Sequence, residues 1–216
     1  MKYRIIILFV AVIASVSCKY KEQKAAELIR NELSKTLYDF GSYEPIETVV
    51  TEAYDSPYNN PECFRQAKEI NTHLKKMLQY VEEAKDAVNY MEIWGAPTYY
   101  SSSYSDRQYY KYKSQAEEIR EKFFEEQGLY KTLGRALQDS IKVLDSEKII
   151  GWEVRHKFRC KTRGELADIE NYRYIVDKQF KNIIIFCEDM DDDDYSLAMG
   201  AIALAEQNGF DKYSDE

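Results

Sequence analysis

Apolar residues recur every three or four positions over two long stretches of the chain. In the first stretch they keep a seven-residue repeat, falling at Ala67, Ile70, Leu74, Met77, Val81, Ala84, Val88 and Met91. A strict 3.5-residue period places these side chains in one narrow seam, which is typical of left-handed coiled-coil packing. We therefore predict a long helix that begins near residue 62.

The second stretch repeats less regularly, with apolar residues at Tyr112, Ala116, Ile119, Phe123, Tyr130, Leu133, Leu137 and Leu144. Glu126 and Ser140 occupy seam positions, and Gly128 and Gly134 each weaken a helix by about 1 kcal/mol relative to alanine. Two helices joined by a loop near residues 94–111 predict an antiparallel hairpin over roughly 62–148. The pattern is compatible with a projecting stalk and with ordinary core helices of a bundle.

The period changes to two after Gly151. Trp152, Val154, His156, Phe158 and Cys160 alternate with Glu153, Arg155, Lys157, Arg159 and Lys161. One apolar and one charged face indicate an antiparallel strand that is covered on one side only. Further strands are predicted at Ser42–Tyr54, Tyr172–Val176 and Asn182–Cys187, and further helices at Lys24–Phe40 and Tyr195–Glu206.

Together these elements predict an α+β fold. It comprises a small antiparallel sheet of about four strands, an inserted long antiparallel helical hairpin, and flanking helices. The expected divisions are a signal peptide at 1–17, a sheet domain formed by 18–61 and 149–216, and the hairpin insertion at 62–148. The strand at 43–54 is expected to pair with the C-terminal strands.

The N-terminus has the pattern of a bacterial lipoprotein signal that ends at Cys18. Lys2 and Arg4 precede an apolar run from Ile5 to Val16, and small residues lead into the cysteine. This layout is typical of an export signal, and the run is too short for a stable transmembrane helix. We expect acylation of Cys18, for example with palmitate, and anchoring at the outer membrane. Plain secretion and an uncleaved anchor are the alternatives.

Charge excludes some partners. The formal net charge is −8, from 30 basic and 38 acidic residues, and residues 1–17 hold two basic residues and no acidic one. The remaining chain is therefore more acidic still. An acidic chain does not fit nucleic acid, which needs clustered Lys and Arg. It does not fit electrostatic adhesion to anionic lipid either, so the lipid anchor would be the whole membrane attachment.

Three cysteines follow Cys18. Cys160 and Cys187 both fall in predicted strands, so a cross-strand disulfide between them could form in an oxidising compartment. The alternative is that both are buried small hydrophobic residues, as unpaired cysteines often are. In the first case Cys63 is left over.

The loop of the predicted hairpin is rich in tyrosine and serine. These residues suit adaptable binding surfaces, because tyrosine offers a large contact area at low entropic cost and serine offers hydrogen bonds. A contact surface for a glycan, a peptide or an envelope protein is therefore one interpretation. The other is a solvated loop whose tyrosines pack against the helices. The candidate contact residues are Tyr99, Tyr100, Tyr104, Tyr109 and Tyr110.

Catalytic chemistry has no clear sequence signature here. The acidic run after the last strand could supply weak calcium ligands at Asp189, Asp191 and Asp193, but it fails the EF-hand spacing, and helix capping explains it better. His73 lies beside a predicted seam and His156 on an apolar strand face, as structural histidines do. The sequence contains neither a zinc-protease HExxH nor a GxSxG elbow, and it predicts no cofactor.

Three further segments of the sequence, in addition to the N-terminal signal, resemble segments of other proteins. They are SYEPIETVVTEAYDSPYNNPEC (Ser42–Cys63), GWEVRHKFRCKTR (Gly151–Arg163) and YIVDKQFKNI (Tyr174–Ile183). With Cys18, they resemble uncharacterised cell-envelope lipoproteins of Gram-negative, gut-type bacteria. The resemblance implies an envelope location and places the first two segments in one antiparallel sheet, but it implies no activity.

The sequence thus favours a binding or scaffolding module that is not an enzyme and that uses the hairpin and its loop. The alternatives are a lipid-anchored envelope hydrolase whose site is not recognisable from sequence, and a purely structural spacer.

Overall fold

The computed structural model describes residues 2–164, 166–187 and 193–210, and it describes side chains from residue 19 onward except at 194. The chain forms two compact units. The sheet unit comprises Met1–Pro61 and Leu144–Ser196, and the hairpin unit comprises Glu62–Val143 and Leu197–Glu216. This α+β architecture is the one that the sequence predicts.

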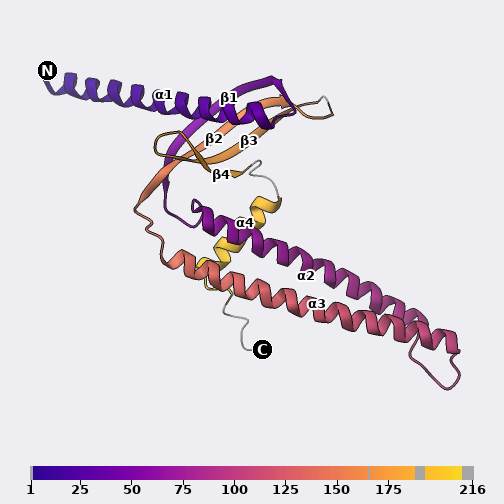
Figure 1. The fold of residues 1–216 in the computed structure, drawn as a ribbon. Coiled ribbons are helices and arrows are strands. Elements are labelled where there is room, and N and C mark those ends of the chain that lie inside the picture. The colour runs from indigo at the N-terminus through magenta and orange to yellow at the C-terminus, as the bar shows by residue number, and fades with distance from the viewer. Residues whose placement is uncertain (1, 165, 188–192, 211–216) are drawn as a thin grey trace. The chain divides into compact units, whose positions relative to one another are not determined.

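The sheet unit contains four antiparallel strands in the order β1-β2-β3-β4 (Figure 1). The strands are β1 (Asp39–Tyr54), β2 (Ile149–Lys161), β3 (Ala167–Asp177) and β4 (Ile183–Cys187). β1 pairs with β2 although almost a hundred residues separate them in the chain, which confirms the predicted pairing. Glycine is required at Gly151, because a Cβ there would lie 2.0 Å from the carbonyl oxygen of Val176 on β3.

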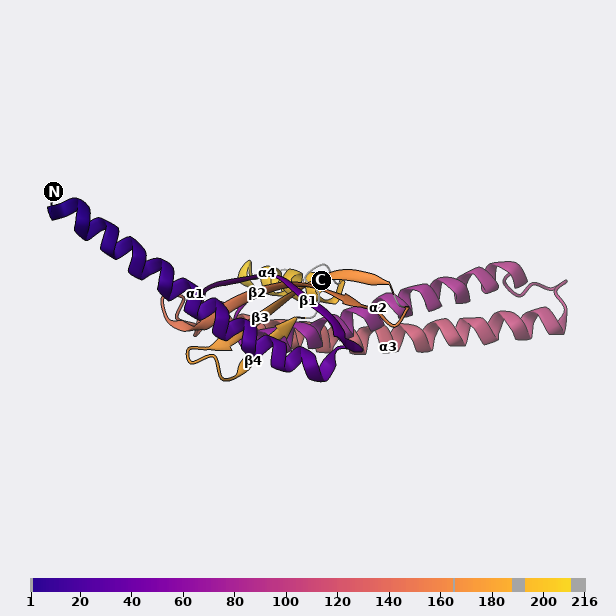
Figure 2. The same cartoon turned by 90° about the horizontal axis from the view of Figure 1, so that it is seen from above.

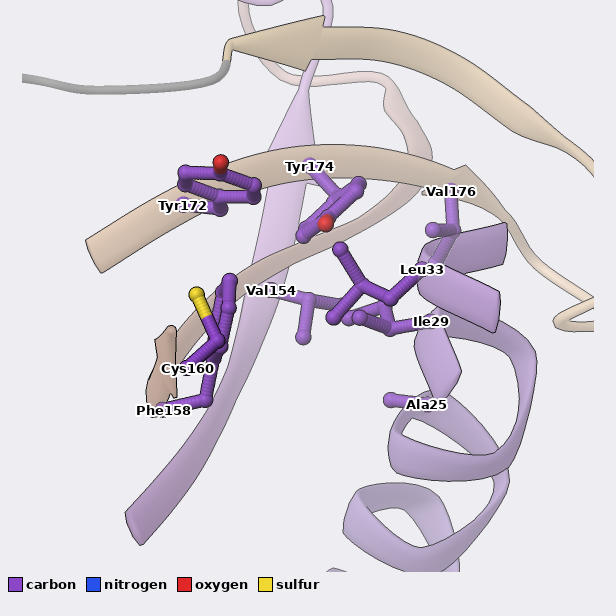
Figure 3. Packing of buried hydrophobic residues seen from close by; sticks show 9 residues of the cluster. All are labelled: Ala25, Ile29, Leu33, Val154, Phe158, Cys160, Tyr172, Tyr174 and Val176. Carbon is purple, nitrogen blue, oxygen red and sulfur yellow. The ribbon is translucent and has the colours of Figure 1, made fainter. Parts of the chain in front are cut away.

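Helix α1 (Lys2–Thr36) covers one face of this sheet. Its buried residues Ala25, Ile29 and Leu33 are spaced by four, so they lie on one side of the helix. Figure 3 shows Ile29 and Leu33 directed toward Val154 and Tyr174 of the sheet. Burial of an Ile or Leu side chain stabilises the fold by about 1.5–3 kcal/mol. α1 ends at Thr36, earlier than predicted, because the chain turns into β1 from Asp39.

The alternation predicted for β2 is confirmed. Val154, His156, Phe158 and Cys160 are buried on the face beneath α1, while Arg155, Lys157, Arg159 and Lys161 are exposed on the other face. The imidazole of His156 is fully buried between two hydroxyls. Its Nε2 lies 2.8 Å from the Tyr43 hydroxyl and its Nδ1 lies 2.9 Å from the Thr48 hydroxyl. The histidine is therefore a core residue with both ring nitrogens satisfied.

The opposite face of the sheet holds a buried ion pair. The guanidinium of Arg173 on β3 donates to Glu153 on β2 at 3.0 Å, and it also donates to the Asn59 side chain. Burial alone would raise the pKa of Glu153, but the hydrogen bonds and charges of Arg173 and Arg155 outweigh it and hold that pKa below its usual range. Arg173 thus fixes the segment that follows β1 against the sheet.

The hairpin unit contains helices α2 (Pro61–Trp94) and α3 (Ser103–Lys142), which run antiparallel along each other in both views (Figures 1 and 2). Cross-helix contacts fix their register. The rings of Tyr90 and Tyr112 stack at 4.7 Å, and Glu126 bonds to His73 and, at 2.9 Å, to Lys76. The hydrogen bonds from His73 and Lys76 lower the pKa of Glu126.

The seam of α3 follows its prediction more closely than the seam of α2. Ile119 and Leu137 are buried, and Glu126 faces α2 as its seam position implies. In α2, however, Ala87 is buried while Val81 and Val88 are about half exposed. Near its C-terminal end, the buried side of α2 therefore includes Ala87 and not the predicted seam residue Val88.

Helix α4 (Asp193–Glu206) connects the two units, and its greater part packs in the hairpin unit. The Asn71 amide of α2 lies against the backbone of α4, with its oxygen 2.8 Å from the Ala198 N–H. Just after α4, the Phe210 ring packs on Tyr130 of α3 at 5.3 Å. The described residues from Leu197 onward therefore group with the hairpin unit, whereas the sequence analysis assigns 149–216 to the sheet domain.

Across the described part of the chain, no helix combines the length and the apolar composition that a bilayer crossing requires.

Candidate functional site

The hairpin tip, residues 93–105, is the part of the surface best suited to contact a ligand. Thirty-one per cent of the chain is charged, yet none of these thirteen consecutive residues is charged. The segment consists of Ile, Trp, Gly, Ala, Pro, Thr, Tyr and Ser. It includes the end of α2, the loop, and the first turn of α3.

Hydrogen bonds within the loop give the tip a defined backbone. Gly95 ends α2 with φ = +67°, a conformation that glycine adopts without strain, and its N–H donates to the Met91 carbonyl at 3.0 Å. The Ser101 hydroxyl accepts from the Thr98 N–H at 3.0 Å and donates to the Asp106 carboxylate. Ser102 caps α3, because its hydroxyl accepts from the Ser105 N–H at 3.1 Å. These bonds tie the two ends of the loop to the helices.

Aromatic pairs support the tip from below. The Trp94 and Tyr104 rings meet edge to face at 5.5 Å across the two helices. About one turn farther from the tip on α2 and two turns farther on α3, the rings of Tyr90 and Tyr112 stack. Offset or edge-to-face aromatic pairs stabilise by about 0.5–1.5 kcal/mol beyond the area they bury. The loop therefore sits on a packed aromatic base.

The two tyrosines of the loop itself project into solvent. Tyr99 is 95% exposed and Tyr100 is 93% exposed, and their rings meet at 90° with centroids 5.3 Å apart. Tyr104 and Tyr110 are just over half exposed, and Tyr109 is half-buried beside Tyr110. The alternative in which the tyrosines pack against the helices applies to Tyr104 and Tyr109 in part, but not to Tyr99 and Tyr100.

Charged side chains border the tip on α3. Asp106 is engaged with Ser101, while Arg107 and Lys111 lie on the solvent side. The Arg107 guanidinium donates to the Ser103 carbonyl at 3.1 Å, which holds it beside the loop. Lys111 lies over the Tyr112 ring, 5.3 Å from its centroid. On α2 the exposed Glu92 directly precedes the tip, so the site has an uncharged aromatic centre and a border of mixed charge.

The structure describes the side chains of the two strand cysteines but not the side chain of the predicted lipidation site. Cys18 lies in the helical backbone of α1, and its side chain is outside the part of the chain whose side chains are described. The predicted bridge between Cys160 and Cys187 is not formed. Cys160 pairs with Asp168 on the face covered by α1, whereas Cys187 pairs with Arg173 on the other face. Two cysteines on opposite faces of a sheet cannot be joined without moving the backbone.

The predicted calcium ligands are only partly placed. Asp189 and Asp191 lie outside the described residues, and Asp193 begins α4. Within the described ranges, no three His, Cys, Asp or Glu side chains converge as metal ligands would.

Two side-chain clusters were not predicted from the sequence. One is Arg173 with Glu153 and Asn59, which depends on tertiary contacts between β2, β3 and the segment after β1. The other is Glu126 with His73 and Lys76, for which a carboxylate at a seam position was the available signal. Both hold elements together and neither lies at the hairpin tip.

Comparison of the chain with known protein families, with curated proteins and with solved structures finds no match in any of the three.

Proposed function

We propose that this chain is a cell-envelope protein that a lipid anchors in the outer membrane and that serves as a binding or scaffolding module. It contacts its ligand through the helical hairpin and the hairpin tip. The N-terminal pattern that ends at Cys18 and the resemblance to envelope lipoproteins support the location. One observation carries the binding role: Tyr99 and Tyr100 are almost fully exposed on a loop that is tied down at both ends.

Exposed rings on an ordered loop favour binding for two reasons. Burying an aromatic ring removes about 150–250 Å² from water, which is a large contribution for one side chain. A loop whose backbone is already held by hydrogen bonds also loses less conformational entropy when it binds a ligand. A purely structural spacer would gain nothing from two uncovered tyrosines, because exposed aromatic surface promotes unwanted association.

The location is tested by intact-mass analysis of the chain produced in a Gram-negative host. A mature chain that begins at Cys18 and carries acyl chains is expected, and Cys18→Ala should abolish both the cleavage and the added mass. An unmodified wild-type chain would contradict the anchor.

The binding role is tested on envelopes of producing cells solubilised in mild detergent. The chain should sediment as part of a larger assembly, and Tyr99→Ser with Tyr100→Ser should return it to the size of the lone chain. Truncating one central interface residue costs about 2 kcal/mol or more, roughly thirtyfold in Kd. The matched control replaces Tyr20 and Tyr38, which are 58% and 71% exposed in the sheet unit. Equal sedimentation of both double variants and the wild type would refute the role of the tip.

A further inference from the structure

The first turns of α1 whose side chains are described already pack against the sheet. Lys19, which directly follows the predicted acylation site, lines the same surface hollow as Thr48 of β1. Two residues farther on, the Lys21 ammonium lies 3.7 Å from the centroid of the Trp152 ring on β2. The helical backbone runs unbroken through this segment to the fully buried core residue Ala25. The described part of α1 therefore contains no flexible linker between position 18 and the folded sheet unit.

The turn between β3 and β4 lies at the same end of the sheet unit. The ring of Phe180 in this turn stacks on Trp152 at 5.8 Å, with an angle of 7° between the two planes. The Trp152 Nε1 also donates to the Lys178 carbonyl at 3.2 Å. Trp152 therefore joins the start of α1 to the turn. These parts form one end of the sheet unit, the anchor end (residues 19–24, Trp152 and 177–182).

The chain between Cys18 and the anchor end is too short to let this end move far from a bilayer. Along a helix, the backbone rises by only about 4.5 Å from Cys18 to Lys21. Even if α1 unwound as far as Ala25, the extended chain from Cys18 would span at most about 25 Å. The polar layer on each side of a bilayer is itself about 5–8 Å thick. Acyl chains on Cys18 would therefore hold the anchor end at the lipid headgroups.

Charge does not oppose contact between the anchor end and the headgroups. The segments in and beside it, 19–27, 52–55, 147–152 and 177–182, hold six basic and six acidic residues. This end is therefore locally neutral, although the whole chain has a net charge of −8. It also contains Tyr20, which is 58% exposed, and the half-buried Trp152. Tyrosine and tryptophan are the residues enriched at membrane–water interfaces.

We infer, on the basis of the acylation of Cys18 in the proposed function, that the anchor end rests on the lipid headgroups and that the sheet unit is held at the bilayer surface without a flexible tether. The acyl chains supply the affinity, because each buried CH₂ adds to membrane binding. The short start of α1 supplies the placement. Detergent that gathers on the same acyl chains would cover the anchor end in the same way.

The test measures energy transfer from Trp152 to dansyl-labelled lipid headgroups. The full-length chain carries Trp94→Phe, so that Trp152 is its one tryptophan. It is produced in a Gram-negative host and reconstituted into vesicles of phosphatidylethanolamine and phosphatidylglycerol. We expect strong transfer. A flexible linker of about twenty Gly and Ser residues inserted after Lys19 should lower the transfer severalfold, because the ends of such a linker lie about 25 Å apart on average. The same linker inserted after Arg163, beyond the other end of β2, is the control and should leave the transfer unchanged.

The remaining outcomes separate this inference from the proposed function. Weak transfer from an acylated chain, unchanged by the linker after Lys19, would overturn the inference and leave the lipid anchor in place. Strong transfer that survives this linker would show that the sheet unit binds the bilayer by itself, which would overturn its placement by the short start of α1. A chain that carries no acyl groups in intact-mass analysis would contradict the proposed function itself.

Discussion

The buried His156 makes the sheet unit sensitive to mild acid. Its imidazole is fully buried beneath α1 against Tyr43 and Thr48, whose hydroxyls contact its two nitrogens. Burial lowers the pKa of His156 from 6.5 to about 4. The unfolded chain therefore takes up a proton at this position at a higher pH than the folded chain does. The contribution is fully present above pH 6.5 and is lost as the pH falls toward 4.

The size of the effect follows from the pKa difference. Each pKa unit corresponds to 1.36 kcal/mol, so a shift of two and a half units amounts to about 3.4 kcal/mol once the pH is below both values. About 2 kcal/mol of this is already lost at pH 5. Glu126 and Glu153 have lowered pKa values as well, but their contributions are lost as the pH falls below the usual carboxyl pKa of 4.5, so His156 dominates at pH 5.

The assay exploits the two tryptophans, because Trp94 lies in the hairpin unit and Trp152 in the sheet unit. In a Trp94→Phe background, urea unfolding followed by fluorescence reports on the sheet unit alone. We expect its free energy of unfolding to fall by about 2 kcal/mol between pH 8 and pH 5, and His156→Gln should remove most of this fall. An equal fall with and without His156 would show that protonation of His156 does not cause the acid sensitivity.

Two further predictions concern the hairpin unit. Gly134→Ala should destabilise it by about 1–3 kcal/mol, because the added Cβ would lie 2.1 Å from the Phe210 ring. Gly128→Ala should instead stabilise α3 by about 1 kcal/mol, because its Cβ would meet nothing within 4 Å. Urea unfolding followed by circular dichroism measures both free energies, and equal effects of the two substitutions would contradict the packing of Phe210 on α3. Glu126→Gln should lower the urea midpoint at pH 7 by removing the charge that His73 and Lys76 share, and should also remove the part of the acid sensitivity below pH 4.5 that comes from its lowered pKa. Glu125→Gln, at an exposed position of α3, is the control. Equal urea midpoints for the two variants would contradict the prediction.

Periodicity predicted the elements of this fold because each period has a direct structural cause. The alternation in β2 records one covered and one open sheet face, and the repeats of α2 and α3 record one shared seam. The seam position of Val88 was wrong because the apolar repeat does not tell which neighbouring small residue, here Ala87, the partner helix covers.

The sequence predicted the elements more accurately than it predicted the contacts between them. Cys160 and Cys187 both lie in strands, as predicted, but strand assignment alone does not tell which face each occupies. The packing of α4 depends on the Asn71 amide and Phe210, which have no sequence signal of their own. For the hairpin tip, composition predicted a tyrosine-rich loop, while the exposure of Tyr99 and Tyr100 depends on the loop's hydrogen bonds.

A binding role for the hairpin tip requires that a ligand covers the tip in the cell envelope. Amide hydrogen exchange of the wild-type chain would be compared between isolated envelopes and the purified chain in detergent. We predict slower exchange across 93–105 in envelopes, with unchanged exchange in the turn at 178–181 of the sheet unit. Equal exchange rates across 93–105 in the two preparations would contradict a ligand-bound tip.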